Sequence, residues 1–277
     1  MRWLITGAAG MVGTDLRKEL ESRGEEIVAL AKSDLDITNR DEVVRFVDDA
    51  RPNFIVNCAA YTKVDQAETE EPLANAINGS AVEFLANAAD RIGAHLVQIS
   101  TDFVFDGSST RPYDINDPTA PLSAYGRSKL IGEHAAAKHT IVRTSWLFGI
   151  HGPNFVEAIR NQIRKGTNPL RVVNDQRGRP TYTPHLARAI IRIANLGAPG
   201  IVHYADEAEC TWFDFASAIN DELGSLVNVE PVTSDQFPRP AKRPAYSVLS
   251  TERYEHLTGV KPESWRDGLR EYLALRA

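Results

Sequence analysis

Short apolar runs alternate with longer amphipathic segments along the first half of the chain. The short runs are rich in valine, isoleucine and leucine, as strands buried on both faces of a parallel sheet are. We expect strands at residues 2–6, 26–30, 54–57, 95–99 and 140–143. Between them, helical spacing of apolar residues predicts helices at 11–23, 38–50 and 72–92 and another from about residue 125. Strands that alternate with helices predict an α/β fold built on a doubly wound parallel sheet.

The second half of the chain has a different pattern. Prolines become frequent after about residue 150, and helical patterns at 183–196, 211–223 and 263–275 alternate with short apolar pieces. We therefore divide the chain into a first domain at 1–150 and a smaller α/β part at 151–277. This boundary is soft, and some later segments are expected to return to the first domain. Thr38 is expected to cap the helix at 38–50, because Asp41 and Glu42 follow in its first turn.

Composition narrows the class of protein. Of 277 residues, 43% are apolar and 25% are charged, which is ordinary for a globular chain. The net charge of −6 argues against nucleic acid or an anionic membrane as the main partner. The two cysteines, Cys58 and Cys210, form no disulfide framework, and we expect them to be reduced in a cytoplasmic protein. We expect no signal peptide and no membrane-spanning segment, because no apolar run approaches ~20 residues.

A glycine-rich segment, Gly7-Ala8-Ala9-Gly10-Met11-Val12-Gly13, lies between the first predicted strand and the first predicted helix. Gly7 can adopt the positive φ of a tight turn, Gly10 lets the backbone approach a pyrophosphate, and Gly13 lets the helix pack close to the sheet. The helix N-terminus adds free N–H groups and a favourable dipole for phosphate. The segment therefore predicts a Rossmann-type dinucleotide-binding domain at 1–150 and leaves substrate binding to 151–277.

The second predicted strand ends without the acidic residue that commonly binds the adenosine ribose. The sequence there is Leu30-Ala31-Lys32-Ser33, so a 2′-phosphate would meet no carboxylate and could meet Lys32. This favours NADPH as the cofactor, and NADH stays possible. Asp36 is placed to approach the adenine or the ribose instead.

Tyr125 and Lys129 form a Tyr-x-x-x-Lys pattern at the start of a predicted helix, where residues four apart share a face. A neighbouring ammonium and an oxidised nicotinamide would lower the phenol pKa from its usual value of ~10. Tyr125 would then give its proton to a carbonyl oxygen as hydride reaches the carbon. Ser100 and Thr101 follow the fourth predicted strand, and a hydroxyl there can polarise the same carbonyl.

Longer motifs extend over nearly the whole chain. They include Asn57-Cys58-Ala59-Ala60-Tyr61-Thr62, Ser100-Thr101-Asp102-Phe103-Val104-Phe105-Asp106-Gly107, Pro121-Leu122-Ser123-Ala124-Tyr125-Gly126, Arg143-Thr144-Ser145-Trp146 and Ala241-Lys242-Arg243-Pro244. Together they resemble the extended short-chain dehydrogenase/reductase family, and within it the branch of the dTDP-4-dehydrorhamnose reductases. The resemblance implies an oxidoreductase that uses NADPH to reduce the 4-keto group of dTDP-4-dehydro-L-rhamnose to dTDP-L-rhamnose.

The resemblance also implies roles for individual residues. The catalytic residues would be Thr101, Tyr125 and Lys129. The cofactor-binding residues would be Gly10, Met11, Val12, Asp36, Ile37, Ala60, Tyr61, Thr62, Tyr125 and Lys129, to which the glycine turn adds Gly7 and Gly13. The substrate-binding residues would be Thr101, Asp102, Tyr125 and Trp146. Arg243, in a proline-rich loop, could pair with the diphosphate of a nucleotide-sugar substrate.

Some members of this branch dimerise around a magnesium ion that three acidic side chains hold. Asp15 and Glu271 lie at two of those positions, but the third is Pro184. Losing one carboxylate of three weakens a site for a hard cation. We therefore predict no metal site, and either a monomer or a homodimer that needs no metal.

Two other functions remain open from the sequence. Another nucleotide-sugar reductase or a 4-epimerase of the same fold would share Tyr125, Lys129 and the glycine turn, although an epimerase would hold its NAD tightly. A non-catalytic nucleotide-binding regulatory subunit would commonly lack the hydroxyl, tyrosine and lysine that this chain keeps.

Overall fold

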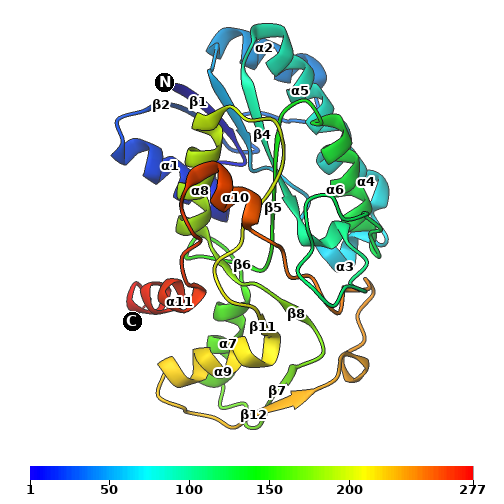
Figure 1. The fold of residues 1–277 in the computed structure, drawn as a ribbon, viewed down its shortest axis with the longest axis vertical. Coiled ribbons are helices and arrows are strands. Elements are labelled where there is room, and N and C mark those ends of the chain that lie inside the picture. The colour runs from blue at the N-terminus through cyan, green and yellow to red at the C-terminus, as the bar shows by residue number, and fades with distance from the viewer. Residues whose placement is uncertain (277) are drawn as a thin grey trace.

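The centre of the molecule is a six-stranded parallel sheet, seen in the computed structural model, which describes residues 1–276 (Figure 1). Its strand order is β10-β5-β4-β3-β1-β2. The strands are β1 (Arg2–Thr6), β2 (Glu26–Leu30), β3 (Phe54–Asn57), β4 (His95–Thr101), β5 (Thr140–Thr144) and β10 (Gly200–His203). The chain passes from β1 to β2 on one side and then crosses to β3 on the other. In sheets of this kind, ligands bind at the carboxyl ends of the strands beside this switch point.

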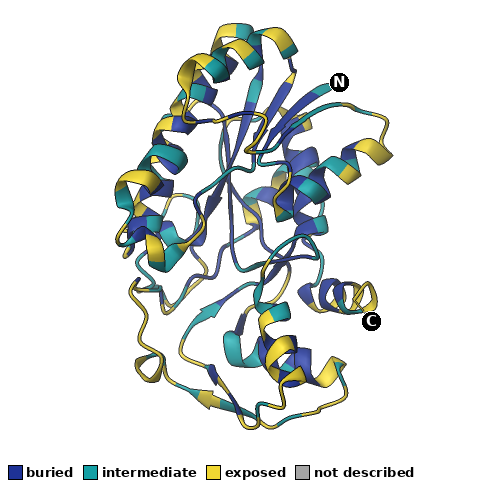
Figure 2. Ribbon diagram, turned by 180° about the vertical axis from the view of Figure 1, so that it is seen from behind, coloured by how far each residue is buried: buried dark blue, intermediate teal, exposed yellow. Residues whose placement is uncertain are grey.

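Helices cover both faces of the sheet, as the alternating pattern predicts. One face is covered by α1 (Met11–Ser22), α8 (Thr183–Leu196) and α10 (Glu252–Thr258). On the other face lie α2 (Arg40–Ala50), α5 (Ala81–Ile92) and α6 (Ala124–Ala135). Figure 2 shows the inner strands of the sheet buried and the outer faces of the helices exposed. The predicted α/β fold with a doubly wound parallel sheet is confirmed.

The helix predicted at 72–92 is not regular throughout. It consists of α4 (Glu71–Asn75), a π-helical turn (Ala76–Ser80) and α5, and the short helix α3 (Val64–Ala67) precedes it. The prediction that Thr38 caps α2 is wrong. Asn39 is the cap, because its side-chain oxygen accepts from the backbone N–H groups of Asp41 and Glu42, whereas the Thr38 hydroxyl donates to Asp36.

A smaller part lies below the sheet in Figure 1 and has its own apolar core. Its helices are α7 (Phe155–Arg164), α9 (Trp212–Glu222) and α11 (Trp265–Ala274). Its strands form three pairs: β6 (Leu147–Phe148) with β9 (Thr181–Tyr182), β7 (Leu170–Val173) with β12 (Val229–Val232), and β8 (Arg177–Gly178) with β11 (Cys210–Thr211). The core of this part is aromatic and includes Phe148, Phe215, Trp265 and Tyr272.

Three later elements, α8, β10 and α10, belong to the central sheet assembly. β10 pairs with β5 at the edge of the sheet, and α8 packs against α1. The division of the chain at about residue 150 stays a prediction, because the chain crosses between the two parts more than once. Within residues 1–276, every helix is too short or too polar to span a membrane.

Candidate active site

The glycine turn connects β1 to α1 at the switch point of the sheet. Gly7 has a φ of +63°, and a Cβ atom there would lie 2.5 Å from the backbone nitrogen of Ala59. A Cβ atom at Gly13 would lie 2.4 Å from the carbonyl oxygen of Gly7. Gly10 is the N-cap of α1 and makes no side-chain capping bond, and the first turn of α1 carries no acidic residue. The turn therefore presents uncapped N–H groups without a competing carboxylate, as a phosphate site requires.

The remaining residues predicted to bind the cofactor lie on the loops that follow β2 and β3. Asp36 accepts hydrogen bonds from the backbone and hydroxyl of Thr38, and these bonds lower the pKa of its carboxyl group. Ile37 is buried beside it. The segment Ala60–Thr62 follows β3, and the Tyr61 backbone is held by two hydrogen bonds with the side chain of Asn78. Residues predicted from three separate motifs thus follow the carboxyl ends of neighbouring strands β2, β1 and β3.

β4 is two residues longer than predicted, and this extension separates the roles of Ser100 and Thr101. Successive side chains of a strand point to opposite faces. The Ser100 hydroxyl donates to the carboxylate of Glu133 inside the protein. The Thr101 hydroxyl donates to Oδ1 of Asp102 at 3.0 Å and lies close enough to Tyr125 to lower its pKa. Of the two hydroxyls, the one that faces the tyrosine belongs to Thr101.

α6 places Tyr125 beside Thr101. Ser123 caps this helix by accepting from the N–H of Gly126 at 3.1 Å. A Cβ atom at Gly126 would lie 2.3 Å from the carbonyl oxygen of Phe103, so the first turn of α6 can lie against the end of β4 only with glycine there. Burial raises the pKa of Tyr125 to about 12, although the Thr101 hydroxyl opposes the effect. At neutral pH the phenol is therefore protonated, which is the form that a proton donor needs.

Lys129 lies one turn further along α6 and is 3% exposed. Its Nζ donates to the carbonyl oxygen of Ile99 at 2.6 Å. Burial lowers the pKa of Lys129 to about 8, and Glu133 and Cys58 oppose this effect. Burial raises the pKa of Tyr125, and the ionisable group acting on it is Asp102, which raises it further. The joint effect of Lys129 and an oxidised nicotinamide on this pKa stays a prediction.

Asp102 is the most unusual carboxylate of the site. It is 2% exposed, and its Oδ2 atom accepts no hydrogen bond from residues 1–276. Burial raises its pKa to about 6, while the nearby hydroxyls of Ser247 and Thr101 oppose the effect. A buried acceptor without a donor costs free energy, so a donor that reached this oxygen would be favoured.

Trp146 lies where β5 leaves the sheet for the smaller part. Its backbone has a φ of +48°, which is strained for a bulky residue. Its ring stacks on Trp212 at the start of α9, with 3.5 Å between ring centroids and an angle of 6° between planes. Trp212 also lines a cavity of about 620 Å³ together with Phe155, Phe237 and other apolar residues of the smaller part. An aromatic wall therefore extends from the sheet into this cavity.

Arg243 lines the same cavity, but its guanidinium is already paired. Nη1 and Nη2 donate to the two carboxylate oxygens of Asp65, each at 3.0 Å. Arg239, which no sequence motif includes, lies four residues earlier in the same proline-rich loop and also lines the cavity. It is near enough to Asp65 to lower the pKa of that carboxyl group, but the two-point ion pair of Asp65 is with Arg243. Arg239 is therefore the less engaged of the two cations.

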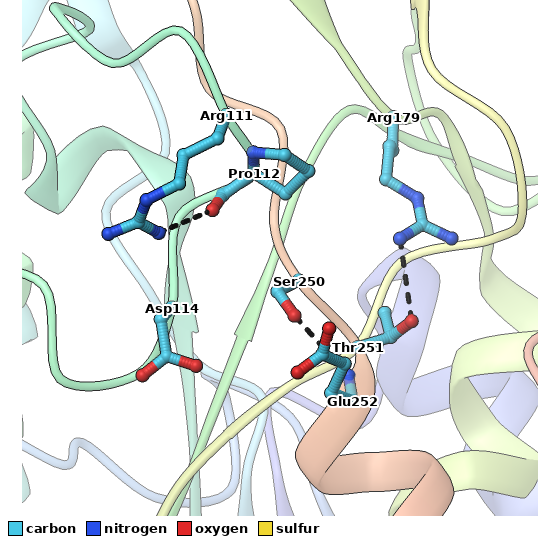
Figure 3. Close-up of a pocket in the computed structure, with 7 residues that line it drawn as sticks. All are labelled: Arg111, Pro112, Asp114, Arg179, Ser250, Thr251 and Glu252. Carbon is cyan, nitrogen blue, oxygen red and sulfur yellow. Dashed lines mark hydrogen bonds between the residues drawn. The ribbon is translucent and has the colours of Figure 1, made fainter.

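A second cavity, of about 350 Å³, lies among residues that no motif singled out (Figure 3). Its two arginines are engaged: Arg111 pairs with Asp117, and Arg179 donates to the carbonyl oxygens of Asp206 and Leu249. Its other lining residues include Asp114, Ser250, Thr251 and Glu252. The predicted catalytic side chains line neither cavity. The larger cavity is the one connected to them, through the stacked rings of Trp212 and Trp146.

The positions of the magnesium site of some relatives hold a different cluster. Asp15 is buried and accepts a hydrogen bond from Thr183, and burial raises its pKa. Glu271 accepts from the Tyr182 hydroxyl at 3.3 Å. Within residues 1–276, no group of three or more His, Cys, Asp or Glu side chains is arranged to hold a metal ion. A monomer or a metal-independent homodimer stays a prediction.

A glycine turn for a dinucleotide, beside a half-buried tyrosine and a buried threonine and lysine, defines the class of protein. This is the arrangement of the nicotinamide-dependent oxidoreductases of the short-chain dehydrogenase type. Comparison with known proteins makes the class more specific. The family described as the RmlD substrate binding domain matches residues 1–276.

Individual relatives agree over nearly the full length. The dTDP-4-dehydrorhamnose reductase of Aggregatibacter actinomycetemcomitans is 41% identical, over 99% of this chain and 97% of its own. A probable dTDP-4,6-dihydroxy-2-methyloxan-3-one 4-ketoreductase of Streptomyces antibioticus is 43% identical, over 98% of this chain and 94% of its own. The crystal structure of dTDP-4-dehydrorhamnose reductase from Bacillus anthracis in complex with NADP is 39% identical and has a TM-score of 0.94, over 99% of both chains.

The chain therefore belongs to the RmlD family, whose members include NAD(P)H-dependent reductases of dTDP-4-keto sugars. Membership of this family, predicted from the motifs around Thr101, Tyr125 and Trp146, is confirmed, and so is the predicted enzyme class.

Proposed function

We propose that this protein uses NADPH to reduce the 4-keto group of dTDP-4-dehydro-L-rhamnose, giving dTDP-L-rhamnose. The observation that carries the proposal is the juxtaposition of Thr101 and a protonated Tyr125, with Lys129 one turn beyond, at the carboxyl end of β4. A carbonyl at this point would meet the phenol of Tyr125, and the Thr101 hydroxyl would donate to it by turning away from Asp102.

Each residue of this set has a distinct task. Bound NADPH supplies the hydride. Tyr125 gives its proton to the oxygen that becomes the new hydroxyl, and Thr101 donates a hydrogen bond that stabilises the charge developing on that oxygen. Lys129 binds the nicotinamide ribose through donors that its bond to Ile99 leaves available.

The cofactor is expected to lie along the carboxyl ends of β1, β2 and β3. In this arrangement Gly7, Gly10, Met11, Val12 and Gly13 would surround the pyrophosphate, supported by the uncapped start of α1. Asp36, Ile37 and the segment Ala60–Thr62 would contact the adenosine and the nicotinamide side. Lys32 and the NADP bound in the Bacillus anthracis relative support NADPH over NADH. The expectation that the end of β2 carries no carboxylate is wrong, because Asp34 accepts from the Ala31 N–H at 2.8 Å.

The nucleotide sugar is expected to lie between the strand ends and the smaller part. Asp102 would accept a sugar hydroxyl through its unpartnered Oδ2, and Trp146 would cover the apolar face of the deoxy sugar. The cavity lined by Trp212 and Phe237 is large enough and apolar enough for the base, and Arg239 and Arg243 at its edge would meet the diphosphate.

A second candidate is reduction of another dTDP-4-keto sugar, since the Streptomyces antibioticus relative is as similar as the rhamnose enzymes. The test is NADPH oxidation by the purified protein with dTDP-4-dehydro-L-rhamnose, with a second dTDP-4-keto sugar and with NADH in place of NADPH. Fast oxidation with the first sugar alone would support the proposal. Oxidation with the second sugar alone would select the other candidate, and tightly bound NAD without net oxidation would favour an epimerase.

A further inference from the structure

A buried charge network lies directly behind the candidate site. Arg143 of β5 is 2% exposed and Glu133 of α6 is 3% exposed. Nε and Nη2 of the arginine donate to the two carboxylate oxygens at 2.9 and 2.7 Å. Burial of such a pair is costly in desolvation free energy, so the pair is weak evidence for stability alone. The position of the pair, next to the candidate site, suggests that it has a functional role.

Glu133 joins the two elements that carry the candidate catalytic side chains. Its Oε1 atom accepts from the Ser100 hydroxyl as well as from Arg143. Ser100 immediately precedes Thr101, and Glu133 follows Lys129 by one helical turn on the same face of α6. A single carboxylate therefore ties the end of β4 to the helix that presents Tyr125 and Lys129.

We propose that Glu133 is a positioning residue for this site: it holds α6 against the end of β4 and provides the negative charge that keeps the buried Lys129 ammonium charged. Arg143 fixes the carboxylate in place. The proposal rests on the proposed function, in which a charged Lys129 binds the cofactor.

The other ionisable groups around this network cannot replace Glu133. Cys58 acts on Lys129 from the loop after β3, but burial raises the pKa of its thiol to about 12, so the thiol is neutral. His203 of β10 faces Arg143 at 3.3 Å, and burial lowers the pKa of its imidazole to about 3, so it is neutral too. Asp102 acts on Tyr125 rather than on Lys129.

The elements on the opposite side of α6 bring no further charge to Lys129. From the π-helical turn, Asn78 donates to Ser128, and from α4, Glu71 pairs with Arg127 at the surface. Among residues 1–276, Glu133 is therefore the carboxylate on which the charge of Lys129 depends.

The experiment measures the protonation of Lys129 directly. The ¹³Cε chemical shift of Lys129, assigned with the variant Lys129→Arg and followed by NMR at a series of pH values, gives the midpoint for this buried amine whether or not the enzyme is active. Glu133→Gln alone would leave Arg143 buried and unpaired, so the main variant is the double substitution Glu133→Gln with Arg143→Met, which removes both charges. Ser100→Ala is the matched control, because it removes the tie to β4 without changing any charge.

We expect the titration midpoint of Lys129 in the folded double variant to fall by about one pH unit, and the alkaline limit of kcat/KM to move with it. Ser100→Ala should leave the midpoint unchanged but lower kcat about tenfold, with an unaltered KM for NADPH. An unchanged midpoint in a double variant with native circular dichroism would refute the electrostatic role. An unchanged kcat in Ser100→Ala would refute the positioning role. If the wild-type protein reduces no keto sugar but the midpoint still falls, the proposed function fails and the electrostatic role stands.

Discussion

Replacing Asp102 by asparagine tests whether the charged carboxylate of Asp102 lowers the stability of the folded protein. The pKa of Asp102 is raised from 3.8 to about 6 by burial. Between these two pH values the folded protein binds more protons than the unfolded chain, so the free energy of unfolding falls as the pH rises through this window. The difference in pKa corresponds to about 3 kcal/mol. That penalty is complete above about pH 6 and absent below about pH 4.

Asparagine has no such titration, but it brings two N–H donors to a place where Oδ2 of the wild-type residue has no partner. An unpaired buried donor costs roughly 1–3 kcal/mol at every pH. The absolute difference in stability between variant and wild type therefore mixes two effects. Its change with pH isolates the buried charge: relative to wild type, the variant should gain about 3 kcal/mol on going from about pH 4 to pH 7.

The measurement is urea unfolding of both proteins at several pH values, with the slope of each transition checked for equality. A difference in stability that does not vary with pH would show that Asp102 is not charged at a thermodynamic cost, and the reasoning would be wrong. The same variant should bind the nucleotide sugar more weakly, while its affinity for NADPH stays unchanged.

Three further predictions concern the geometry of the site. Tyr125→Phe should lower kcat by roughly 10²–10⁴-fold, because it removes the proton donor. A fluorescence titration should show that the variant binds NADPH nearly as well as the wild type. A near-normal kcat would exclude Tyr125 as the donor. Gly126→Ala should lower both activity and stability, the latter by roughly 1–3 kcal/mol, since the new Cβ would lie 2.3 Å from the Phe103 oxygen. Gly152→Ala is its control in thermal unfolding, because a Cβ atom there meets nothing closer than 3.7 Å. Trp212→Ala should raise KM for the nucleotide sugar but not for NADPH. Trp212→Phe should return the KM for the nucleotide sugar most of the way to the wild-type value. Equal changes in both KM values would argue against an aromatic wall at Trp146.

The sequence predicts the central sheet well because its strands are local patterns. Runs rich in valine, isoleucine and leucine mark β1 to β5, and the position of the glycine turn follows from them. The edge strand β10 is four residues long and joins the sheet from the second half of the chain, so no local pattern shows where it pairs. The π-helical turn cannot be predicted from the sequence for a different reason: the apolar spacing of a helix continues across it.

The parts of the site that sequence cannot show are contacts between distant residues. Asp65 and Arg243 are 178 positions apart, and their pairing changes which arginine is the more available for a diphosphate. Trp146 and Trp212 come from different motifs, and only the fold brings their rings together. The residues alone leave Ser100 and Thr101 open, and the family resemblance implies Thr101. The length of β4 and the alternation of its side chains supply the physical reason.

Several costly features converge at the ends of β4 and β5, and they share one explanation. Asp102 has a buried oxygen without a donor, Trp146 has a strained backbone, and Lys129 is an almost fully buried ammonium with one acceptor. Each would be removed by selection for stability alone, since each has a simple uncharged or unstrained replacement. A sugar hydroxyl would satisfy the oxygen of Asp102, a deoxy-sugar face would cover the indole, and a ribose would accept from the lysine. The same ligands would thus satisfy all three groups, which is why we assign chemistry to this edge of the sheet rather than to the charge-balanced cavity around Arg179.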